Sequence, residues 1–241
     1  MLKIEKLSVR YPDQTIGIDN VSLCAKEGES VALIGANGAG KTSLIMALVG
    51  VIPSNGNVFA DNVKLNKDNL NEIRNKIGVV FQNPDDQLFM PTIYDNIAFG
   101  LRNMGMNELE INARIETCLS LLNIKHLRNK TALKISGGEK RMAALATVLV
   151  MEPSIMLFDE PTAFLDPKAR RILLSVLNGL QHTKIIATHD LMFAAETCKR
   201  SVLLKDGSVF ADGPSKELLY DVQLMDKCGV EAIGACGREI Y

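Results

Sequence analysis

The stretch that decides the fold is Gly-Ala-Asn-Gly-Ala-Gly-Lys-Thr at residues 35–42, which fits the pattern G-x-x-x-x-G-K-[ST]. The apolar run SVALI at 30–34 precedes it, and the apolar run TSLIMALVG at 42–50 continues from its last residue. This order predicts a buried strand, a tight turn and a helix, the context in which the pattern forms a phosphate-binding loop. The alternative, a glycine turn ahead of an ordinary helix, is weaker because the whole motif stands in its full context.

The chemistry of a triphosphate explains the residue types of this loop. Its glycines permit tight backbone geometry, so successive N–H groups can converge on phosphate oxygens. The helix that begins near Lys41 adds the positive end of its dipole. Lys41 can reach the β- and γ-phosphates, and the Thr42 hydroxyl can ligate Mg²⁺. The residues expected to bind the nucleotide here are Gly35, Ala36, Asn37, Gly38, Ala39, Gly40, Lys41, Thr42 and Ser43.

A second motif ends another apolar run, SIMLFDE at residues 154–160, with two carboxylates. A buried strand that finishes in this way can deliver both acids to the edge of a phosphate site. We expect Asp159 to hold Mg²⁺ and Glu160 to act on the attacking water as general base. The alternative is a strand end that carries solvated acids, and the phosphate-binding loop makes it less attractive.

Apolar patterning predicts an α/β fold. The short runs at 30–35, 76–82, 154–160, 183–190 and 201–207 are continuously apolar rather than alternating, which is typical of parallel strands covered on both faces. By contrast, the first 30 residues alternate between polar and apolar and predict antiparallel strands. The expected architecture is a P-loop NTPase with a mostly parallel core sheet and an N-terminal antiparallel β subdomain.

The stretch between residues 92 and 150 carries apolar residues at steps of three and four, which predicts helices. Since it interrupts the series of strands, we expect an inserted helical subdomain at about 92–150. The core and the antiparallel part would then occupy about 1–91 and 151–220, and a short C-terminal tail about 221–241. All of this forms one domain of 241 residues.

Composition narrows the class of protein. Hydrophobic residues make up 47% of the chain, which predicts a folded core. Lys and Arg number 27 against 28 Asp and Glu, a formal net charge of −1. This balance offers no support for bulk nucleic-acid binding, so no nucleic-acid partner is expected.

The chain also carries no predicted membrane span. No apolar run approaches the roughly 18–20 residues needed to cross a bilayer. The N-terminus has no apolar signal-peptide core, and the five cysteines are scattered with no CxxC. We therefore expect reduced thiols and a cytoplasmic location.

A third motif, Ile135-Ser136-Gly137-Gly138-Glu139-Lys140-Arg141, lies between the other two, with Ser136 placed 23 residues before Asp159. Here the sequence resembles the ATP-binding cassette (ABC) ATPases, whose signature Leu-Ser-Gly-Gly-Gln lies shortly upstream of the acidic strand. The other marks of that family are Tyr11, Gln82, the run Ala163-Phe164-Leu165-Asp166 and His189. The resemblance covers about residues 1–215 and implies the ABC ATPase fold.

The resemblance implies ATP and Mg²⁺ as cofactors, and ATP hydrolysis as the reaction. Tyr11 matches the aromatic residue that stacks on adenine. Glu160, Gln82 and His189 match the catalytic base, the glutamine loop and the switch histidine. The magnesium ligands implied in this way are Thr42, Gln82 and Asp159.

The signature run predicts a second anion site, because Ser136-Gly137-Gly138 at a helix start offers a hydroxyl, bare N–H groups and a dipole. A single chain does not need two phosphate-binding sites, here called cradles, for one γ-phosphate. In the family the second cradle comes from a partner subunit, so the resemblance implies a head-to-tail homodimer around two ATP molecules, with Asp166 also at the nucleotide. Two departures stand out: Ile135 replaces leucine, and Glu139 replaces glutamine and adds negative charge.

The run Gln82-Asn83-Pro84-Asp85-Asp86-Gln87-Leu88-Phe89 indicates the class of transporter. It resembles the ATPase of energy-coupling factor importers, and among them the cobalt or nickel type. The resemblance implies a peripheral protein on the cytoplasmic face of the membrane. A transmembrane coupling protein and a substrate-binding membrane subunit would dock near Gln82–Phe89, with Asp85 and Asp86 as candidate coupling residues.

Two other readings stay open. The chain could serve another ABC transporter class, such as one for amino acids or lipids, although the run after Gln82 argues against it. It could also be a cassette that works on DNA or ribosomes without transport, but such proteins usually carry two cassettes or long insertions and basic patches.

Overall fold

The computed structural model describes residues 1–163 and 165–235. The strands are β1 (Leu2–Arg10), β2 (Ile16–Ala25), β3 (Ser30–Ile34), β4 (Asn55–Ala60), β5 (Val63–Lys64), β6 (Ile77–Val80), β7 (Ile155–Asp159), β8 (Thr183–Ala187), β9 (Arg200–Lys205) and β10 (Ser208–Pro214). The α-helices are α1 (Lys41–Leu48), α2 (Leu70–Lys76), α3 (Ile93–Asn103), α4 (Glu108–Leu121), α5 (Gly137–Leu149), α6 (Pro167–Gly179), α7 (Leu191–Thr197), α8 (Ser215–Leu218) and α9 (Val222–Cys228). Short 3-10 turns are η1 (Pro84–Asp86), η2 (Lys125–Leu127) and η3 (Ala132–Lys134).

In the described part of the chain the strands form two sheets. One has the order β2-β1-β4-β5 with antiparallel neighbours. The other has the order β10-β9-β3-β8-β7-β6, in which β10 is antiparallel to β9 and all other neighbours are parallel. The predicted fold class is confirmed, with a parallel-rich core sheet beside an antiparallel N-terminal sheet.

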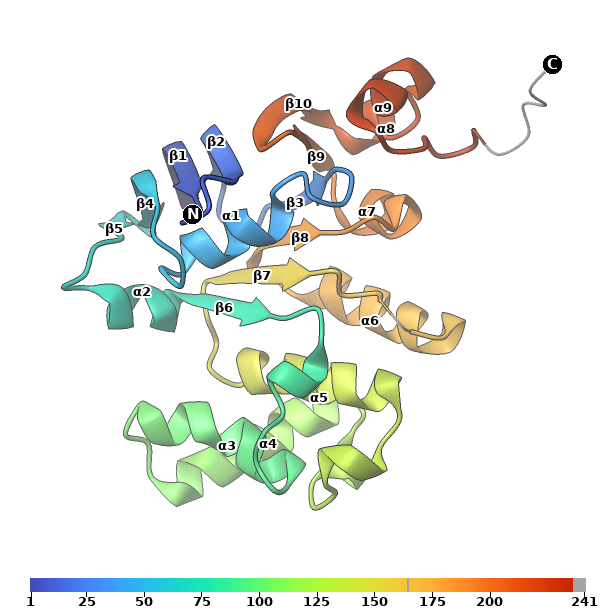
Figure 1. The fold of residues 1–241 in the computed structure, drawn as a ribbon. Coiled ribbons are helices and arrows are strands. Elements are labelled where there is room, and N and C mark those ends of the chain that lie inside the picture. Colours follow the sequence, from blue (N-terminus) through green and yellow to red (C-terminus); the bar gives the residue numbers. More distant parts are fainter. Residues whose placement is uncertain (164, 236–241) are drawn as a thin grey trace.

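Two apolar layers hold these parts together. Helix α1 packs between the sheets, where Leu44, Ile45 and Leu48 are fully buried with residues of β1 and β2. The alternate side chains of the core strands, such as Met156 and Phe158 of β7, join the second layer with the helices. A parallel sheet needs both faces covered, and this arrangement covers them (Figure 1).

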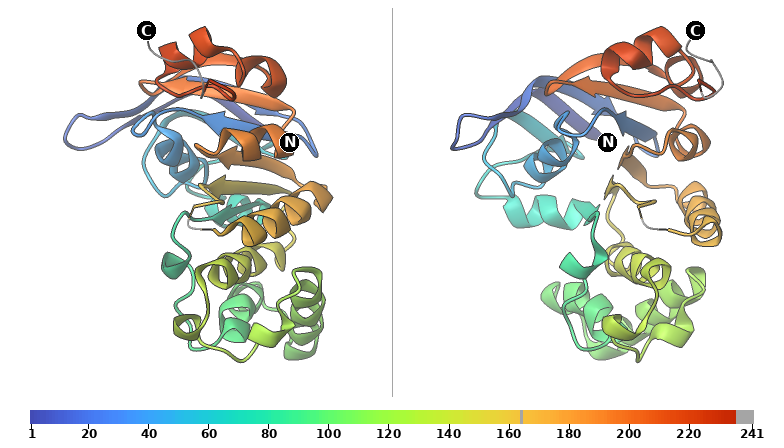
Figure 2. Two further views of the ribbon diagram at one scale, coloured as in Figure 1. Left: turned by 90° about the vertical axis from the view of Figure 1, so that its right-hand side faces the viewer. Right: turned by 45° about the vertical axis from the view of Figure 1, so that its right-hand side comes forward.

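Helices α3, α4 and α5 gather at one end of the molecule, below β6 in the view of Figure 1 and in both views of Figure 2. They fall inside the stretch 92–150 predicted to be helical. The exact subdomain boundaries stay a prediction. The weakly patterned end of the chain carries α9, whose Met225 and Cys228 are buried against the core. Within the ranges 1–163 and 165–235, no helix is long and apolar enough to cross a bilayer.

Candidate active site

The phosphate-binding loop joins β3 to α1, and close packing around it explains two of its glycines. A Cβ on Gly35 would lie 2.4 Å from the Leu204 carbonyl oxygen of β9, and one on Gly40 would lie 2.3 Å from the Gly17 carbonyl oxygen. Gly40 also has a φ of 101°, in the left-handed region that favours glycine. Side chains at these positions would push the loop away from the two sheets that support it.

Lys41 lies in the centre of the loop and is 8% exposed. Its Nζ donates to the carbonyl oxygens of Gly35 at 2.7 Å and Ala36 at 3.2 Å. These bonds hold the ammonium group in the curve of the loop, where a nucleotide phosphate would meet it.

The two acids at the end of β7 take different environments. Asp159 is 3% exposed and accepts a hydrogen bond from the Thr42 hydroxyl at 2.8 Å. Burial raises the pKa of Asp159, and the neighbouring carboxylate of Glu160 adds to this, while Thr42 and Lys41 oppose it. A buried carboxylate next to a hydroxyl is a donor set of hard oxygens that suits Mg²⁺, whose charge would stabilise the ionised acid.

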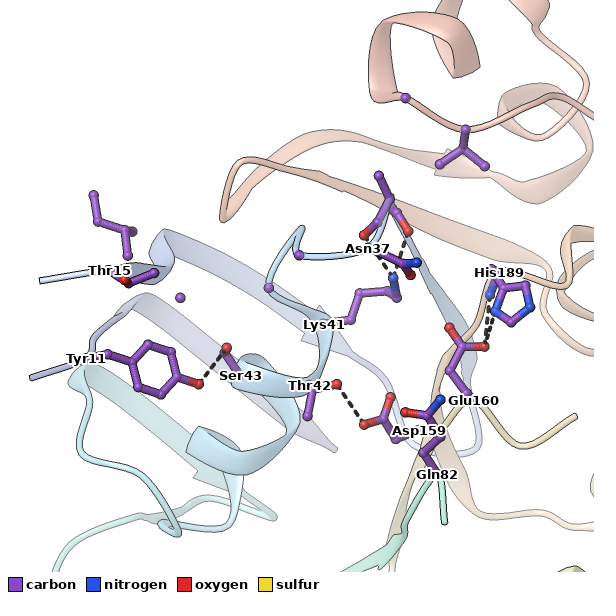
Figure 3. Close-up of a pocket in the computed structure, with 18 of the residues that line it drawn as sticks. Tyr11, Thr15, Asn37, Lys41, Thr42, Ser43, Gln82, Asp159, Glu160 and His189 are labelled. Carbon is purple, nitrogen blue, oxygen red and sulfur yellow. Dashed lines mark hydrogen bonds and ion pairs between the residues drawn. The ribbon is translucent and has the colours of Figure 1, made fainter. Parts of the chain in front are cut away.

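Glu160 is held in a constrained position. Its φ of 45° lies in the left-handed region, which is costly for a residue with a side chain and is found at functional sites. Its Oε2 accepts from the His189 backbone N–H at 3.1 Å and contacts the His189 ring Nδ1 at 2.8 Å. Figure 3 shows this pair facing the loop from the ends of β7 and β8. The carboxylate is therefore aimed into the site.

These side chains open on one cavity of about 750 Å³. The predicted site residues that line it are Tyr11, Gly35, Ala36, Asn37, Gly38, Gly40, Lys41, Thr42, Ser43, Gln82, Asp159, Glu160 and His189. Ala39 does not line it and is buried beneath the loop. The Tyr11 hydroxyl shares a hydrogen bond of 2.9 Å with the Ser43 hydroxyl, which fixes the ring at the cavity edge (Figure 3).

The signature residues lie elsewhere. Ser136, Gly138 and Asp166 line a separate hollow of about 410 Å³, and Gly137 begins helix α5 beside it. Asp166 caps α6, accepting from the backbone N–H groups of Lys168 and Ala169 at 2.8 Å each. Phe164 of the predicted run 163–166 lies outside the described residues. The structure of one chain thus separates the two predicted phosphate cradles.

Two groups of cavity residues were not predicted from the sequence. Thr15, Ile16 and Gly17 join the site because the chain turns back after Tyr11, whose N–H donates to the Thr15 carbonyl at 2.9 Å. Their closeness to Tyr11 in sequence was a usable signal. The segment 229–231, after α9, also lines the cavity. It belongs to no motif, and α9, which precedes it, packs on β9.

The family model for ABC transporters matches residues 18–163. The chain belongs to the ABC transporter ATPases. Over 99% of its length this cassette is 42% identical to an ABC transporter ATP-binding protein of Geobacter sulfurreducens, 98% of which is covered. It is 40% identical to the energy-coupling factor transporter ATP-binding protein EcfA of Carboxydothermus hydrogenoformans, over 96% of this chain and 87% of that one.

Solved structures agree with this assignment. The cassette superposes on cbiO1 of Clostridium perfringens, part of the cbiONQ transporter complex, with a TM-score of 0.82 and 35% identity, covering 94% of this chain and 93% of that one. A dimeric ATP-binding cassette bound to ADP and Pi gives a TM-score of 0.81 at 30% identity, covering 89% and 99%. This chain is therefore an ATP-binding, ATP-hydrolysing subunit of a transporter.

Proposed function

We propose that this cassette energises an importer of the energy-coupling factor type, for cobalt or nickel ions, as a head-to-tail homodimer around two ATP molecules on the cytoplasmic face of the membrane. The observation that carries the proposal is an apolar groove between the core and the helical end of the molecule. The names EcfA and cbiO1 among its relatives support the importer class, and the cobalt or nickel cargo rests on the resemblance of the run after Gln82.

The dimer follows from the separation of the two cradles. The phosphate-binding loop opens on one cavity, and Ser136 and Gly138 line another. A γ-phosphate can meet both only if the second cradle comes from another copy of the chain. Rotation by a two-fold axis then builds two equivalent sites at once. The dimeric neighbour bound to ADP and Pi supports this arrangement.

Each of these cavity residues has its own role in ATP hydrolysis. Thr42, Gln82 and Asp159 would hold Mg²⁺, which when bound offsets phosphate charge. Lys41 and the loop N–H groups bind the phosphates, and Tyr11 offers its ring to the adenine. Glu160 takes the proton of the attacking water, with His189 keeping the carboxylate in position. Loss of the γ-phosphate removes the bridge between the cradles, so the dimer can open.

The mostly apolar groove has a volume of about 290 Å³ and is walled by β6, α3, the end of α5 and the segment after α1, and Arg74 of α2 also lines it. Phe89 is 65% exposed there and meets the ring of Phe99 edge-on, with centroids 5.3 Å apart. Val51 on the opposite side is 56% exposed. Exposed apolar side chains around a hollow favour an amphipathic helix as the partner. We assign the groove to a helix of the transmembrane coupling protein.

The acidic pair Asp85 and Asp86 does not line this groove. Asp85 instead pairs with Lys140 of α5 at 2.6 Å, and Asp86 accepts from the Asn83 side-chain amide at 3.2 Å. The carboxylates stand on η1, beside the groove residues Gln87 and Phe89. In the proposal they attract basic residues that flank the docked helix, while the apolar groove binds its apolar side.

Co-purification tests the proposal. The chain is expressed with the products of its neighbouring genes, and the partners retained in detergent are identified. A small transmembrane coupling protein together with a metal-binding membrane subunit is the expected result. Permeases that work with an external binding protein would support another ABC importer class instead. Recovery of ribosomes or nucleic acid without a membrane partner would refute transport.

A matched pair of variants tests the groove. Phe89→Asp places a charge among the apolar walls and should abolish recovery of the membrane partner while ATP binding persists. Leu109→Asp is the control, since Leu109 is 86% exposed and is not among the groove residues. Equal recovery by the two variants would show that the partner docks elsewhere.

A further inference from the structure

The start of helix α5 carries a carboxylate on its own anion cradle. Oε2 of Glu139 accepts from the Ser136 backbone N–H at 2.8 Å and from the Ser136 hydroxyl at 3.0 Å. In return the Glu139 N–H donates to the Ser136 hydroxyl oxygen at 3.3 Å. This is a reciprocal capping box at the helix N-terminus. Both protons that Ser136 could offer to a phosphate are therefore given to Glu139.

The Glu139 side chain that occupies the donors of Ser136 is a carboxylate anion. The hydrogen bond from the Ser136 backbone lowers the pKa of Glu139, burial opposes this, and His126 and the Ser136 hydroxyl lower the pKa further. The second oxygen, Oε1, contacts the ring Nε2 of His126 at 3.1 Å. His126 belongs to no sequence motif and is 58% exposed beside the same hollow. A carboxylate at a helix N-terminus is stabilised by the dipole, as a phosphate would be.

We infer that Glu139 is a resident anion that the γ-phosphate of the partner's ATP must displace from Ser136, and that it sets the ATP concentration at which the dimer closes. His126 receives the displaced carboxylate, because it already holds the other oxygen of the same group. This inference rests on the proposed head-to-tail dimer. It makes Glu139 and His126 positioning residues that tune closure.

Glu139→Gln isolates the charge, since glutamine at this position also completes a capping box. The assay is ATP-dependent dimer formation by light scattering, in a Glu160→Gln background where ATP is not turned over. The ATP concentration at half-maximal dimer should fall about fivefold, which is ~1 kcal/mol. The difference should shrink at high salt, because exposed charges are screened. Thermal unfolding of the two proteins should coincide, because the cap is retained.

His126→Ala supplies the second arm of a double-mutant cycle. In the presence of Glu139 this variant should raise the ATP concentration needed for the dimer about threefold. In the Glu139→Gln protein it should change nothing. Glu139→Ala, which loses both the charge and the cap, shows how much of any effect comes from a frayed helix.

The outcomes separate the two proposals. The protein with Glu139 intact could dimerise at the same ATP concentration as Glu139→Gln. That result would overturn the role of Glu139 but would still support the dimer. An equal effect of His126→Ala with either residue at position 139 would overturn the role of His126. A parent that never dimerises with ATP would overturn both the dimer and the inference built on it.

Discussion

Replacing Arg141 by methionine should cost more stability than any exposed ion pair of the chain provides. Arg141 is 1% exposed. From α5 it donates to the carbonyl oxygens of Phe81 at 2.6 Å and Gln82 at 2.5 Å. A methionine has similar length but no donors, so the two partly buried carbonyls lose their charged partner.

The expected magnitude follows from these contacts. A hydrogen bond to a charged group contributes about 1.5–3 kcal/mol, so two give about 3–6 kcal/mol. Part of this is offset because the variant no longer buries a guanidinium group, whose burial lowers the pKa of Arg141. We expect a net loss of about 3 kcal/mol, which lowers the melting temperature of a chain of this size by about 6–12 °C.

The assay is thermal unfolding followed by circular dichroism, with ATP hydrolysis measured on the same protein. Lys140→Met is the matched control, because Lys140 is the preceding residue of the same helix and also pairs with the segment after β6, through Asp85 at 2.6 Å. That pair is partly exposed and contributes about 1 kcal/mol or less. Equal melting shifts for the two variants would refute the argument that Arg141 holds the glutamine loop to the helix.

Three further predictions concern the site and its surroundings. Glu160→Gln should lower steady-state ATP hydrolysis about 10²–10⁴-fold while ATP still binds, and unchanged turnover would remove Glu160 as the general base. Lys41→Ala should weaken ATP binding at least about tenfold in calorimetry, because the ammonium group held by the loop carbonyls is lost, and equal affinity would contradict the assignment of the loop. Burial alone would raise the pKa of Asp190, but the hydrogen bond from Arg170 at 2.8 Å holds it below the ordinary value. Since the folded pKa is the lower one, this carboxylate stabilises the fold above its ordinary pKa near pH 4, and the stabilisation is lost as the pH falls through the folded pKa. Asp190→Asn should therefore lose less stability than the parent as the pH is lowered below about 4, as followed by urea midpoints, and parallel pH profiles would exclude this role.

The parts of the fold that the sequence predicts are those governed by local pattern. The run at 30–34 coincides with β3, and the acidic run at 154–160 contains β7. Their continuous apolar character follows from burial on both faces, so it could be read without the structure. The loop at 35–42 could also be predicted, because its motif is continuous in the sequence. The structure adds that the carbonyl groups of Leu204 and Gly17 approach Gly35 and Gly40.

What the sequence did not predict depends on contacts between distant residues. The segment 229–231 reaches the nucleotide cavity because α9 packs on β9, and no residue of that segment marks this. The signature residues were predicted as a phosphate cradle, but the capture of Ser136 by Glu139 depends on the side-chain conformation. Similarly, the groove is assembled from β6, α3 and α5, and no single one of them displays it.

Helix α5 connects the Ser136 cradle with the apolar groove. It begins at the Ser136 cradle, and Thr147 and Val148 in its last turn wall the groove. Its 13 residues make a rod about 20 Å long, so a tilt of roughly 10° about one end displaces the other by about 3 Å. If α5 moves as a rigid rod, a membrane helix bound in the groove and an ATP bound at the Ser136 cradle both favour particular orientations of α5. Linkage is reciprocal, so in the proposed dimer ATP-driven closure would change the affinity for the membrane subunit by the same factor by which that subunit changes closure. In the proposed transporter, each step of the cargo cycle in the membrane subunits would then change the ATP concentration at which the two cassettes close, although the cassettes do not bind the cargo.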